Sequence, residues 1–289
     1  MQQIVTLGLI QSRATVSPSR NLAATAQRVR LAAKRGAQII CVQELFRSPY
    51  FPQTEDADLF ALAESIPGPT TEVFCPLARE EEVVVVVSVF EKRAAGVYHN
   101  TVVVIDADGA ILGKYRKMHI PDDPGFYEKF YFTPGDLGFR TFRTRYANIG
   151  TLICWDQWFP EAARLTALKG AEILFYPTAI GWHSSEPITI RKDQQSVWEL
   201  VQRGHAVTNG VYVAAVNRVG KEGELKFWGH SFVADPSGAI LARGAQDKPE
   251  TLIVRCDLSK IAETRHHWPF LRDRRIDAYH EITERFLES

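Results

Sequence analysis

Residues 147–161 read Ala-Asn-Ile-Gly-Thr-Leu-Ile-Cys-Trp-Asp-Gln-Trp-Phe-Pro-Glu, and they carry the signals for a strand, a sharp turn and a helix. The apolar residues 149–153 are typical of a short buried strand, which ends at Cys154. Pro160 then opens a helix-like segment over 161–168, and Gly170 follows its end. This spacing predicts that Cys154 lies on a tight strand-to-helix turn that presents its side chain to a reacting group. A cysteine at a strand end is also common as a small buried hydrophobic residue, so the rest of the chain must decide its role.

Strands and helices alternate on both sides of this stretch. The chain opens with an apolar run at 4–10, helical spacing over 21–34 and a second apolar run at 37–43. Such a strand–helix–strand unit favours a sheet covered by helices. Further strands are expected at 83–87, 98–105, 110–115, 171–176, 211–216, 230–234, 239–242 and 251–256, and further helices at 70–81 (weakened or kinked by Pro76) and 188–208. So many strands exceed one open sheet with ordinary loops, which predicts an α/β fold with two packed sheets flanked by helices.

Composition narrows the class of protein. Of the 289 residues, 45% are hydrophobic and 24% are charged, as in an ordinary globular protein. Lys+Arg and Asp+Glu both total 34, so no electrostatic footprint for nucleic acid or an anionic membrane is expected. No linker-like segment divides the chain, and we expect residues 1–289 to form a single domain. The first strand also lacks the glycine-rich loop of nucleotide-binding folds.

The cysteines and the apolar runs indicate the cellular compartment of the protein. The four cysteines are widely separated, which is unlike a zinc site and indicates a reduced, cytoplasmic protein. We expect neither a signal peptide nor a membrane span, because the N-terminus enters a strand directly and the apolar run at 83–90 is too short to cross a bilayer.

Charged residues at the ends of predicted strands offer partners for Cys154. A cysteine nucleophile needs a base and an oxyanion stabiliser. Glu44 follows the strand at 37–43 and could be the base, whereas Lys117 could stabilise the thiolate and the oxyanion. Glu128 lies in a long, aromatic-rich loop over 114–136 and could orient Lys117 or the substrate. Each of these residues could equally be a solvated surface charge, and spacing alone does not bring them together.

A cysteine–histidine pair is the competing arrangement. The available histidines are His119, His183, His205 and His230. The adjacent pair His266-His267 could suggest a metal, but neighbouring side chains on an ordered backbone point apart, so we expect no metal site.

Three motifs together resemble a known family. They read Gln43-Glu44-Leu45-Phe46, Tyr115-Arg-Lys117-Met-His119 and Leu152-Ile-Cys154-Trp-Asp156. Their order is similar to the Glu-Lys-Cys triad of the nitrilase superfamily, the carbon–nitrogen hydrolases, and the likeness extends to residues 268–275. This resemblance implies a four-layer α-β-β-α sandwich without a cofactor, in which Glu44 is the base, Lys117 and the Trp155 N–H stabilise the oxyanion, and Glu128 positions Lys117 and the substrate. It also implies a homo-oligomer, with Arg164 and the helix at 161–168 as interface candidates.

The segments 121–136 and 154–161 are similar to the branch that hydrolyses N-carbamoylputrescine to putrescine, carbon dioxide and ammonia, in polyamine biosynthesis. Such a small cationic carbamoyl substrate needs carboxylates for its ammonium group and apolar walls for its methylene groups. The candidates for this role are Tyr50, Asp122, Asp123, Trp155, Trp182 and Glu186, of which Asp123 and Glu186 lead for the ammonium group. A β-ureidopropionase-like or aliphatic amidase activity is the alternative within the class. A non-catalytic binding or scaffold protein is the alternative outside it.

Overall fold

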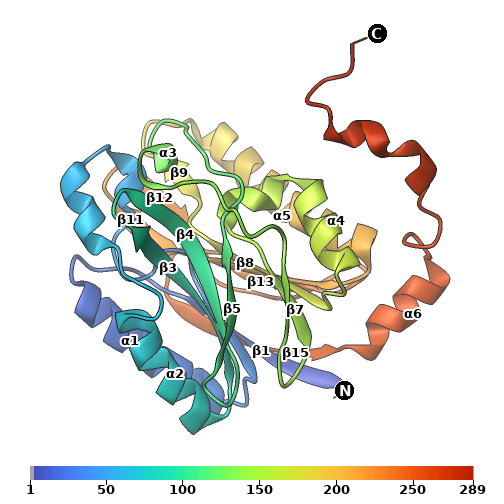
Figure 1. Cartoon of the computed structure of the whole chain (residues 1–289), viewed down its shortest axis with the longest axis horizontal. Helices are drawn as coiled ribbons and strands as arrows, with labels where there is room; N and C mark the ends of the chain where they lie inside the picture. Colours follow the sequence, from blue (N-terminus) through green and yellow to red (C-terminus); the bar gives the residue numbers. More distant parts are fainter. Residues whose placement is uncertain (1–2, 289) are drawn as a thin grey trace.

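The computed structural model describes residues 3–288, and two β-sheets packed face to face form its centre (Figure 1). The strands are β1 (Ile4–Gln11), β2 (Ile39–Val42), β3 (Val84–Ala94), β4 (Val97–Ile105), β5 (Ile111–Arg116), β6 (Thr141–Arg143), β7 (Asn148–Thr151), β8 (Ile173–Thr178), β9 (Gly181–His183), β10 (Tyr212–Asn217), β11 (Val219–Glu222), β12 (Leu225–Trp228), β13 (Phe232–Ala234), β14 (Ile240–Arg243) and β15 (Glu250–Asp257). The α-helices are α1 (Pro18–Lys34), α2 (Pro69–Glu81), α3 (Glu128–Tyr131), α4 (Pro160–Leu168), α5 (Ile188–Asn209) and α6 (Ser259–His267). Short 3₁₀ helices lie at Phe51–Gln53, Ala57–Leu62, Cys154–Trp158, Ile276–Ala278 and His280–Thr283.

Each main sheet has six strands, in the orders β15-β1-β2-β3-β4-β5 and β14-β13-β10-β8-β7-β6. Helices α1 and α2 pack on the first sheet, whereas α4 and α5 pack on the second (Figure 1). The sheets contact each other through β1 and β10 and through β2 and β8. The predicted four-layer α-β-β-α sandwich is therefore confirmed.

The valine-rich strand β3 shows why both faces of the first sheet are apolar. Val84 and Val86 belong to the core between the two sheets, whereas Val85 and Val87 belong to the core under α1 and α2. Successive side chains of a strand point to opposite faces, so a run of valines supplies two cores at once.

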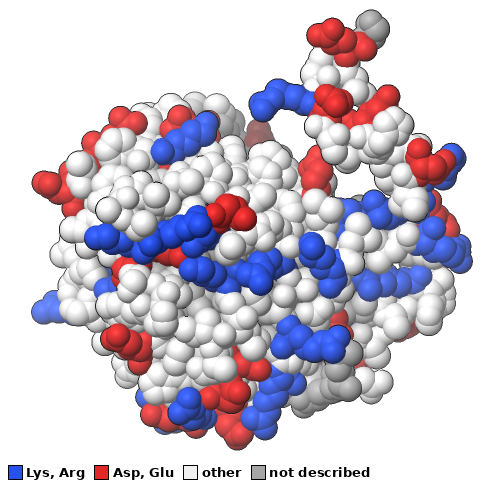
Figure 2. Space-filling model, viewed as in Figure 1, with Lys and Arg blue, Asp and Glu red and all other residues white. Residues whose placement is uncertain are grey.

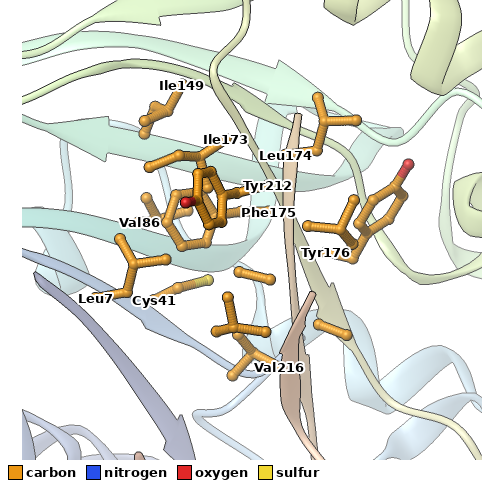
Figure 3. Packing of buried hydrophobic residues seen from close by; sticks show 14 of the residues in the cluster. Leu7, Cys41, Val86, Ile149, Ile173, Leu174, Phe175, Tyr176, Tyr212 and Val216 are labelled. Carbon is orange, nitrogen blue, oxygen red and sulfur yellow. The ribbon is translucent and has the colours of Figure 1, made fainter. Parts of the chain in front are cut away.

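Strand β8 does the same for the second sheet. In Figure 3, Phe175 lies on the side of Leu7, Cys41 and Val86 of the first sheet, and Tyr176 points the other way. Every residue of β8 is buried, which confirms the strand predicted over 171–176. The strand continues through Pro177, where we expected it to end, because Pro177 and Val216 are paired near the end of the parallel ladder with β10.

Strand direction places the candidate catalytic residues at one edge of each sheet. Strand β2 runs parallel to β3, β4 runs antiparallel to β3, and β5 runs antiparallel to β4. The carboxyl ends of β2 and β5 therefore lie at the same edge, and Glu44 and Lys117 follow these ends. In the second sheet β7 is parallel to β8, and Cys154 follows the carboxyl end of β7. Sites in α/β sheets favour such ends.

Helix α2 agrees with the helix predicted over 70–81 and contains Pro76 in its interior. Other elements differ from the expectation. The segment between the predicted strand at 171–176 and the predicted helix at 188–208 contains β9, which pairs with β12 in a small three-stranded sheet that also includes β11. Strands β6, β11 and β12 and helix α6 were not predicted, because short strands with charged residues carry no clear apolar period.

The C-terminal segment exposes apolar side chains, and the surface carries both signs of charge. After α6 the chain extends away from the sandwich, and Ile276 and Phe286 are exposed along it (Figure 1). Lys and Arg form a band across the face in Figure 2, with Asp and Glu around it, so both signs of charge are present there. None of the helices within residues 3–288 is long and apolar enough to cross a membrane.

Candidate active site

Cys154 lies on the predicted strand-to-helix turn. It begins the 3₁₀ helix Cys154–Trp158 between β7 and α4, and its φ is +40°. A non-glycine residue in this left-handed region is strained by about 1–2 kcal/mol, so its surroundings must hold it there. The side chain is buried, and its Sγ donates to the Ala179 carbonyl at 3.9 Å. Burial and Glu44 raise the pKa of the Cys154 thiol well above its usual value, although Lys117 opposes them.

The structure brings Glu44, Lys117 and Glu128 together in the interior. Lys117 Nζ donates to Glu44 Oε1 at 2.9 Å and to Glu128 Oε2 at 2.6 Å. Both carboxylates and the ammonium group are essentially unexposed. Glu128 begins the short helix α3 inside the long loop that follows β5. The contacts explain why a loop of this length is ordered here.

Burial and charge act against each other in this group. Burial lowers the pKa of Lys117, but Glu128 and Glu44 outweigh it, so the pKa of Lys117 is raised on balance. Burial raises the pKa of Glu128 to about 7, and Glu44 adds to this effect while Lys117 reduces it. Lys117 therefore remains an ammonium group at neutral pH.

Glu44 has one engaged oxygen and one free oxygen. Oε1 accepts from Lys117 and from Asn100 Nδ2, the latter at 2.7 Å. Within the described part of the chain, Oε2 is buried and has no hydrogen-bond partner. An unpaired buried carboxylate oxygen is costly in a resting protein, and such an oxygen is suited to accept a proton.

A cavity of about 790 Å³ opens beside these residues. Cys154, Trp155 and Glu128 line it together with apolar side chains from α5 and from neighbouring loops. Its acidic lining residues are Asp123, Glu128, Glu186 and Asp193. No Lys or Arg occurs among the described residues that line it. The cavity thus presents negative charge to any bound molecule.

The predicted tail-binding residues divide into two groups. Trp155, Asp123 and Glu186 line the cavity. In the described part of the chain the lining does not include Tyr50, Asp122 or Trp182. Buried Tyr50 donates from its hydroxyl to Glu128 Oε1 at 2.7 Å, and Asp122 is exposed on the loop. Trp182 packs against Trp228, and its indole N–H donates to the Arg191 carbonyl at 2.8 Å.

The histidines are engaged elsewhere. His119 pairs with Asp156 at 2.7 Å, and His205 Nε2 lies 2.8 Å from the Gln157 carbonyl oxygen. His183 lines the cavity, whereas no hydrogen bond joins a histidine to Cys154 in the described residues. Residues 3–288 also contain no group of three or more His, Cys, Asp or Glu side chains placed to hold a metal ion.

Comparison with known proteins now places this geometry in a family. Residues 6–266 match the profile described as carbon-nitrogen hydrolase. The chain belongs to the carbon–nitrogen hydrolase family. This hydrolase is 47% identical over 286 residues to an N-carbamoylputrescine amidase from Solanum lycopersicum, an alignment that covers 96% of this chain and 94% of the relative. It is 39% identical over 287 residues to a citrullinase from Francisella tularensis, covering 98% of this chain and 99% of the relative.

A solved structure agrees with the fold. The crystal structure of a carbon-nitrogen hydrolase from Helicobacter pylori G27 matches the hydrolase with a TM-score of 0.95 and 46% sequence identity. The match covers 98% of this chain and 100% of the other. Family and fold are therefore those that the sequence motifs resembled.

Two buried residues that support the hydrolase site were missed in the sequence. Asn100 lies within β4, where a polar residue between a histidine and a threonine in a valine-rich strand was the available signal. Arg218 is fully buried and donates to the carbonyls of Glu44 at 3.1 Å and Leu45 at 2.7 Å. It also pairs with Glu222 at 2.7 Å, so this ion pair holds the backbone that carries Glu44. Arg218 follows a predicted strand, but nothing in the sequence showed that it points inward.

Proposed function

We propose that this hydrolase converts N-carbamoylputrescine into putrescine, carbon dioxide and ammonia. The observation that carries the proposal is the cavity lined by Cys154 together with Asp123, Glu186 and Asp193, with no Lys or Arg among its described lining residues. Such a lining suits a substrate with a reactive carbamoyl group at one end and an ammonium group at the other. The plant relative with the matching printed activity supports the same choice.

Glu44, Lys117 and Cys154 share the chemistry in this proposal. Glu44 Oε2 takes the Cys154 thiol proton, and the thiolate attacks the carbamoyl carbon. The ammonium group of Lys117 and the backbone N–H of Trp155 stabilise the oxyanion. Glu44 passes the proton to the departing nitrogen, and the carbon remains bound to Sγ as a thioester-type intermediate.

Water completes the cycle. Glu44 takes a proton from a water molecule, the hydroxide attacks the intermediate, and the thiolate of Cys154 leaves and recovers that proton. The carbamic acid so formed breaks down into carbon dioxide and an amine. Glu128 positions Lys117 through the contact of 2.6 Å, and Tyr50 in turn fixes Glu128.

The tail is recognised by the free carboxylates of the cavity. Glu186 is already occupied, since it accepts from His183 N at 2.8 Å and from Gln194 Nε2 at 2.7 Å. The Asp123 and Asp193 side chains have no such partner within the described residues, and both are exposed enough to meet a ligand. We therefore assign the substrate ammonium group to Asp193 and Asp123, of which Asp193 was not foreseen in the sequence.

A substrate panel tests the proposal. The panel comprises N-carbamoylputrescine, butylurea with a neutral tail, citrulline with an added carboxylate, 3-ureidopropionate, and butyramide, each scored by ammonia release. We expect the highest kcat/KM for N-carbamoylputrescine. A higher value for citrulline, for 3-ureidopropionate or for butyramide would replace the proposal by a citrullinase, a β-ureidopropionase-like enzyme or an aliphatic amidase, respectively.

A matched pair of variants tests the tail assignment. Asp193→Asn should raise KM for N-carbamoylputrescine about 5- to 30-fold, the effect of about 1–2 kcal/mol for a partly exposed charge-assisted contact. KM for butylurea should stay within about twofold, because this substrate has no ammonium group. Asp122→Asn is the control, since Asp122 is exposed on the same loop as Asp123 but does not line the cavity. Equal changes for both substrates would refute the assignment.

A non-catalytic scaffold is the alternative outside the class. Stoichiometric labelling of Cys154 with iodoacetamide, protected by N-carbamoylputrescine, distinguishes the two. A scaffold without a working site would show neither selective labelling of this buried thiol nor protection.

We further propose that residues 1–289 form one domain, that the enzyme is cytoplasmic and that it assembles as a homo-oligomer through α4 and α5. The shared core of both sheets supports the first proposal, and four free cysteines support the second.

The proposed oligomer interface has exposed apolar side chains. Leu165 and Leu168 on α4 and Leu200 on α5 are exposed, and a buried guanidinium nitrogen of Arg164 has no partner within residues 3–288. A monomeric mass by light scattering would refute the assembly. The proposed chemistry needs no cofactor.

A further inference from the structure

A fully buried carboxylate outside the reacting groups joins the two segments that carry them. Asp156 follows Cys154 by two residues and has no exposed surface. Its Oδ2 accepts from the Ile153 N–H at 2.9 Å and from the Tyr115 hydroxyl at 2.8 Å. Its Oδ1 accepts from the His119 N–H at 3.0 Å and from His119 Nδ1 at 2.7 Å.

The bonds on one side of Asp156 close the turn of the nucleophile. The side chain binds Ile153 N–H, and the Asp156 N–H donates to the Ile153 carbonyl at 3.0 Å. These bonds span Cys154 and hold its φ at +40°. They therefore oppose the local strain of a cysteine in the left-handed region.

The bonds on the other side fix the segment of the lysine. Tyr115 and His119 flank Lys117 along the chain, and both donate to the same carboxylate. The His119 ring also stacks on Phe159, with ring centroids 3.7 Å apart and an interplanar angle of 6°. Phe159 directly follows the 3₁₀ helix that begins at Cys154, so this stacking is a second link between the same segments.

We propose that Asp156 is a positioning residue that sets Cys154 Sγ against Lys117 Nζ by bridging their backbones. The proposal rests on the proposed function only in taking these groups as the reacting pair. A displacement of about 1 Å between reacting groups can reduce turnover about 100-fold, so loss of this bridge is expected to lower kcat.

The amide of asparagine cannot replace this bridge. Each oxygen of Asp156 accepts from a backbone N–H, one from Ile153 and one from His119. In an Asp156→Asn variant the NH₂ group must face one of these N–H groups, whichever way the amide is turned. One donor is then unpaired, and either the turn or the lysine segment shifts.

The test compares Asp156→Asn with Asp235→Asn as a matched control. Asp235 is also a buried carboxylate that closes a turn, because its Oδ1 accepts from the N–H groups of Ser237 at 2.9 Å and Ala239 at 3.1 Å. Asp156→Asn should lose stability, whereas Asp235→Asn keeps one carbonyl oxygen for both N–H groups and should lose less. For the folded fraction, only Asp156→Asn should lower kcat, by roughly 10- to 100-fold, with KM within about twofold of the wild type.

Alkylation of Cys154 by iodoacetamide, followed by mass spectrometry of its peptide, gives a readout that needs no substrate. We expect it to slow in Asp156→Asn, because Glu44 no longer meets the thiol. If the wild type alkylates normally but does not hydrolyse N-carbamoylputrescine, the proposed substrate is wrong and the alkylation comparison still decides this inference.

A second variant covers a failure to fold. Asp156→Ser keeps a hydroxyl group that can accept from the Ile153 N–H but is too short to reach His119, so the turn remains closed while the bridge is broken. It should show the same loss of kcat and the same slower alkylation. A folded Asp156→Asn or Asp156→Ser variant with wild-type kcat, or with unchanged or faster alkylation, would overturn the proposal.

Discussion

Replacing Lys117 by methionine removes the only cation that contacts both buried carboxylates of the site in the described residues. Lys117 Nζ lies 2.9 Å from Glu44 Oε1 and 2.6 Å from Glu128 Oε2. Methionine is similar in length and apolar, so the change removes charge with little loss of volume. Glu44 and Glu128 then face each other in the interior without a counterion.

The expected loss follows from this geometry. Removing one partner of a buried ion pair costs about 3–5 kcal/mol, because a charge remains buried and unpaired. That is a large part of the 5–15 kcal/mol by which a domain is typically stable. Glu128, whose pKa burial already raises to about 7, can avoid part of this cost by binding a proton, so its pKa in the folded state rises further without Lys117. A raised folded-state pKa stabilises at low pH and loses that contribution as pH rises, so the deficit should be larger at pH 8 than at pH 5.5.

Urea unfolding followed by tryptophan fluorescence at both pH values measures this deficit. Adding Glu128→Gln to Lys117→Met should restore part of the stability at pH 8, because one of the two buried charges is gone. It should not restore turnover, which needs the ammonium group of Lys117.

Arg116→Met is the matched control. Arg116 is the preceding residue, is also buried, and pairs with Glu91 at 2.8 Å and Asp136 at 2.7 Å. Its loss should destabilise the fold but leave kcat/KM of the folded fraction within a few-fold of the wild type. The reasoning fails if Lys117→Met is as stable as the wild type at pH 8, or if Arg116→Met abolishes turnover as completely as Lys117→Met.

Three further outcomes follow from other contacts. Cys154→Ala should fold with near wild-type stability and release no ammonia, and measurable turnover at the wild-type rate would exclude Cys154 as the nucleophile. Arg218→Met should lower stability by about 3–5 kcal/mol, because Glu222 loses its buried partner. It should also lower kcat, because the carbonyl of Glu44 loses a hydrogen-bond donor. Unchanged urea unfolding would contradict the first expectation, and an unchanged rate of ammonia release would contradict the second. Burial raises the pKa of Glu91, but hydrogen bonds, chiefly from Arg116, lower it to about 2. The ionised Glu91 therefore contributes no more than about 3 kcal/mol to stability, which is present above pH 4.5 and lost as pH falls towards 2. Glu91→Gln should make the free energy of unfolding depend less steeply on pH in that window, and an equally steep loss in the variant would refute the assignment.

The sequence predicted which residues carry the chemistry better than it predicted how they come together in space. Glu44 and Cys154 each follow an apolar run of strand length, so their positions at strand ends could be foreseen. The sequence could not show that these two residues meet Lys117, because that depends on the relative direction of β2 and β5 and on the packing of one sheet on the other. The family resemblance supplied that step.

The residues that were missed share a physical reason. Asp193 lies within α5, and only the packed position of that helix decides which of its side chains line the cavity. Arg218 acts through backbone carbonyls distant in the sequence, and no local pattern encodes such contacts. Strands β11 and β12 pair with each other across Gly223, and β12 also pairs with β9, so tertiary pairing rather than apolar alternation defines them.

The burial of Cys154 has a consequence for the enzyme between turnovers. A thiol with a pKa well above its usual value is protonated at neutral pH, and peroxides and disulfides react with thiolates. Reaction at Cys154 therefore depends on removal of this proton by Glu44, so a reagent that reacts with thiolates reports on that contact, while three other cysteines are also present. Of these, half-buried Cys75 is the most accessible to solvent, so its rate of alkylation is set mainly by exposure and gives the internal reference for the rate at Cys154.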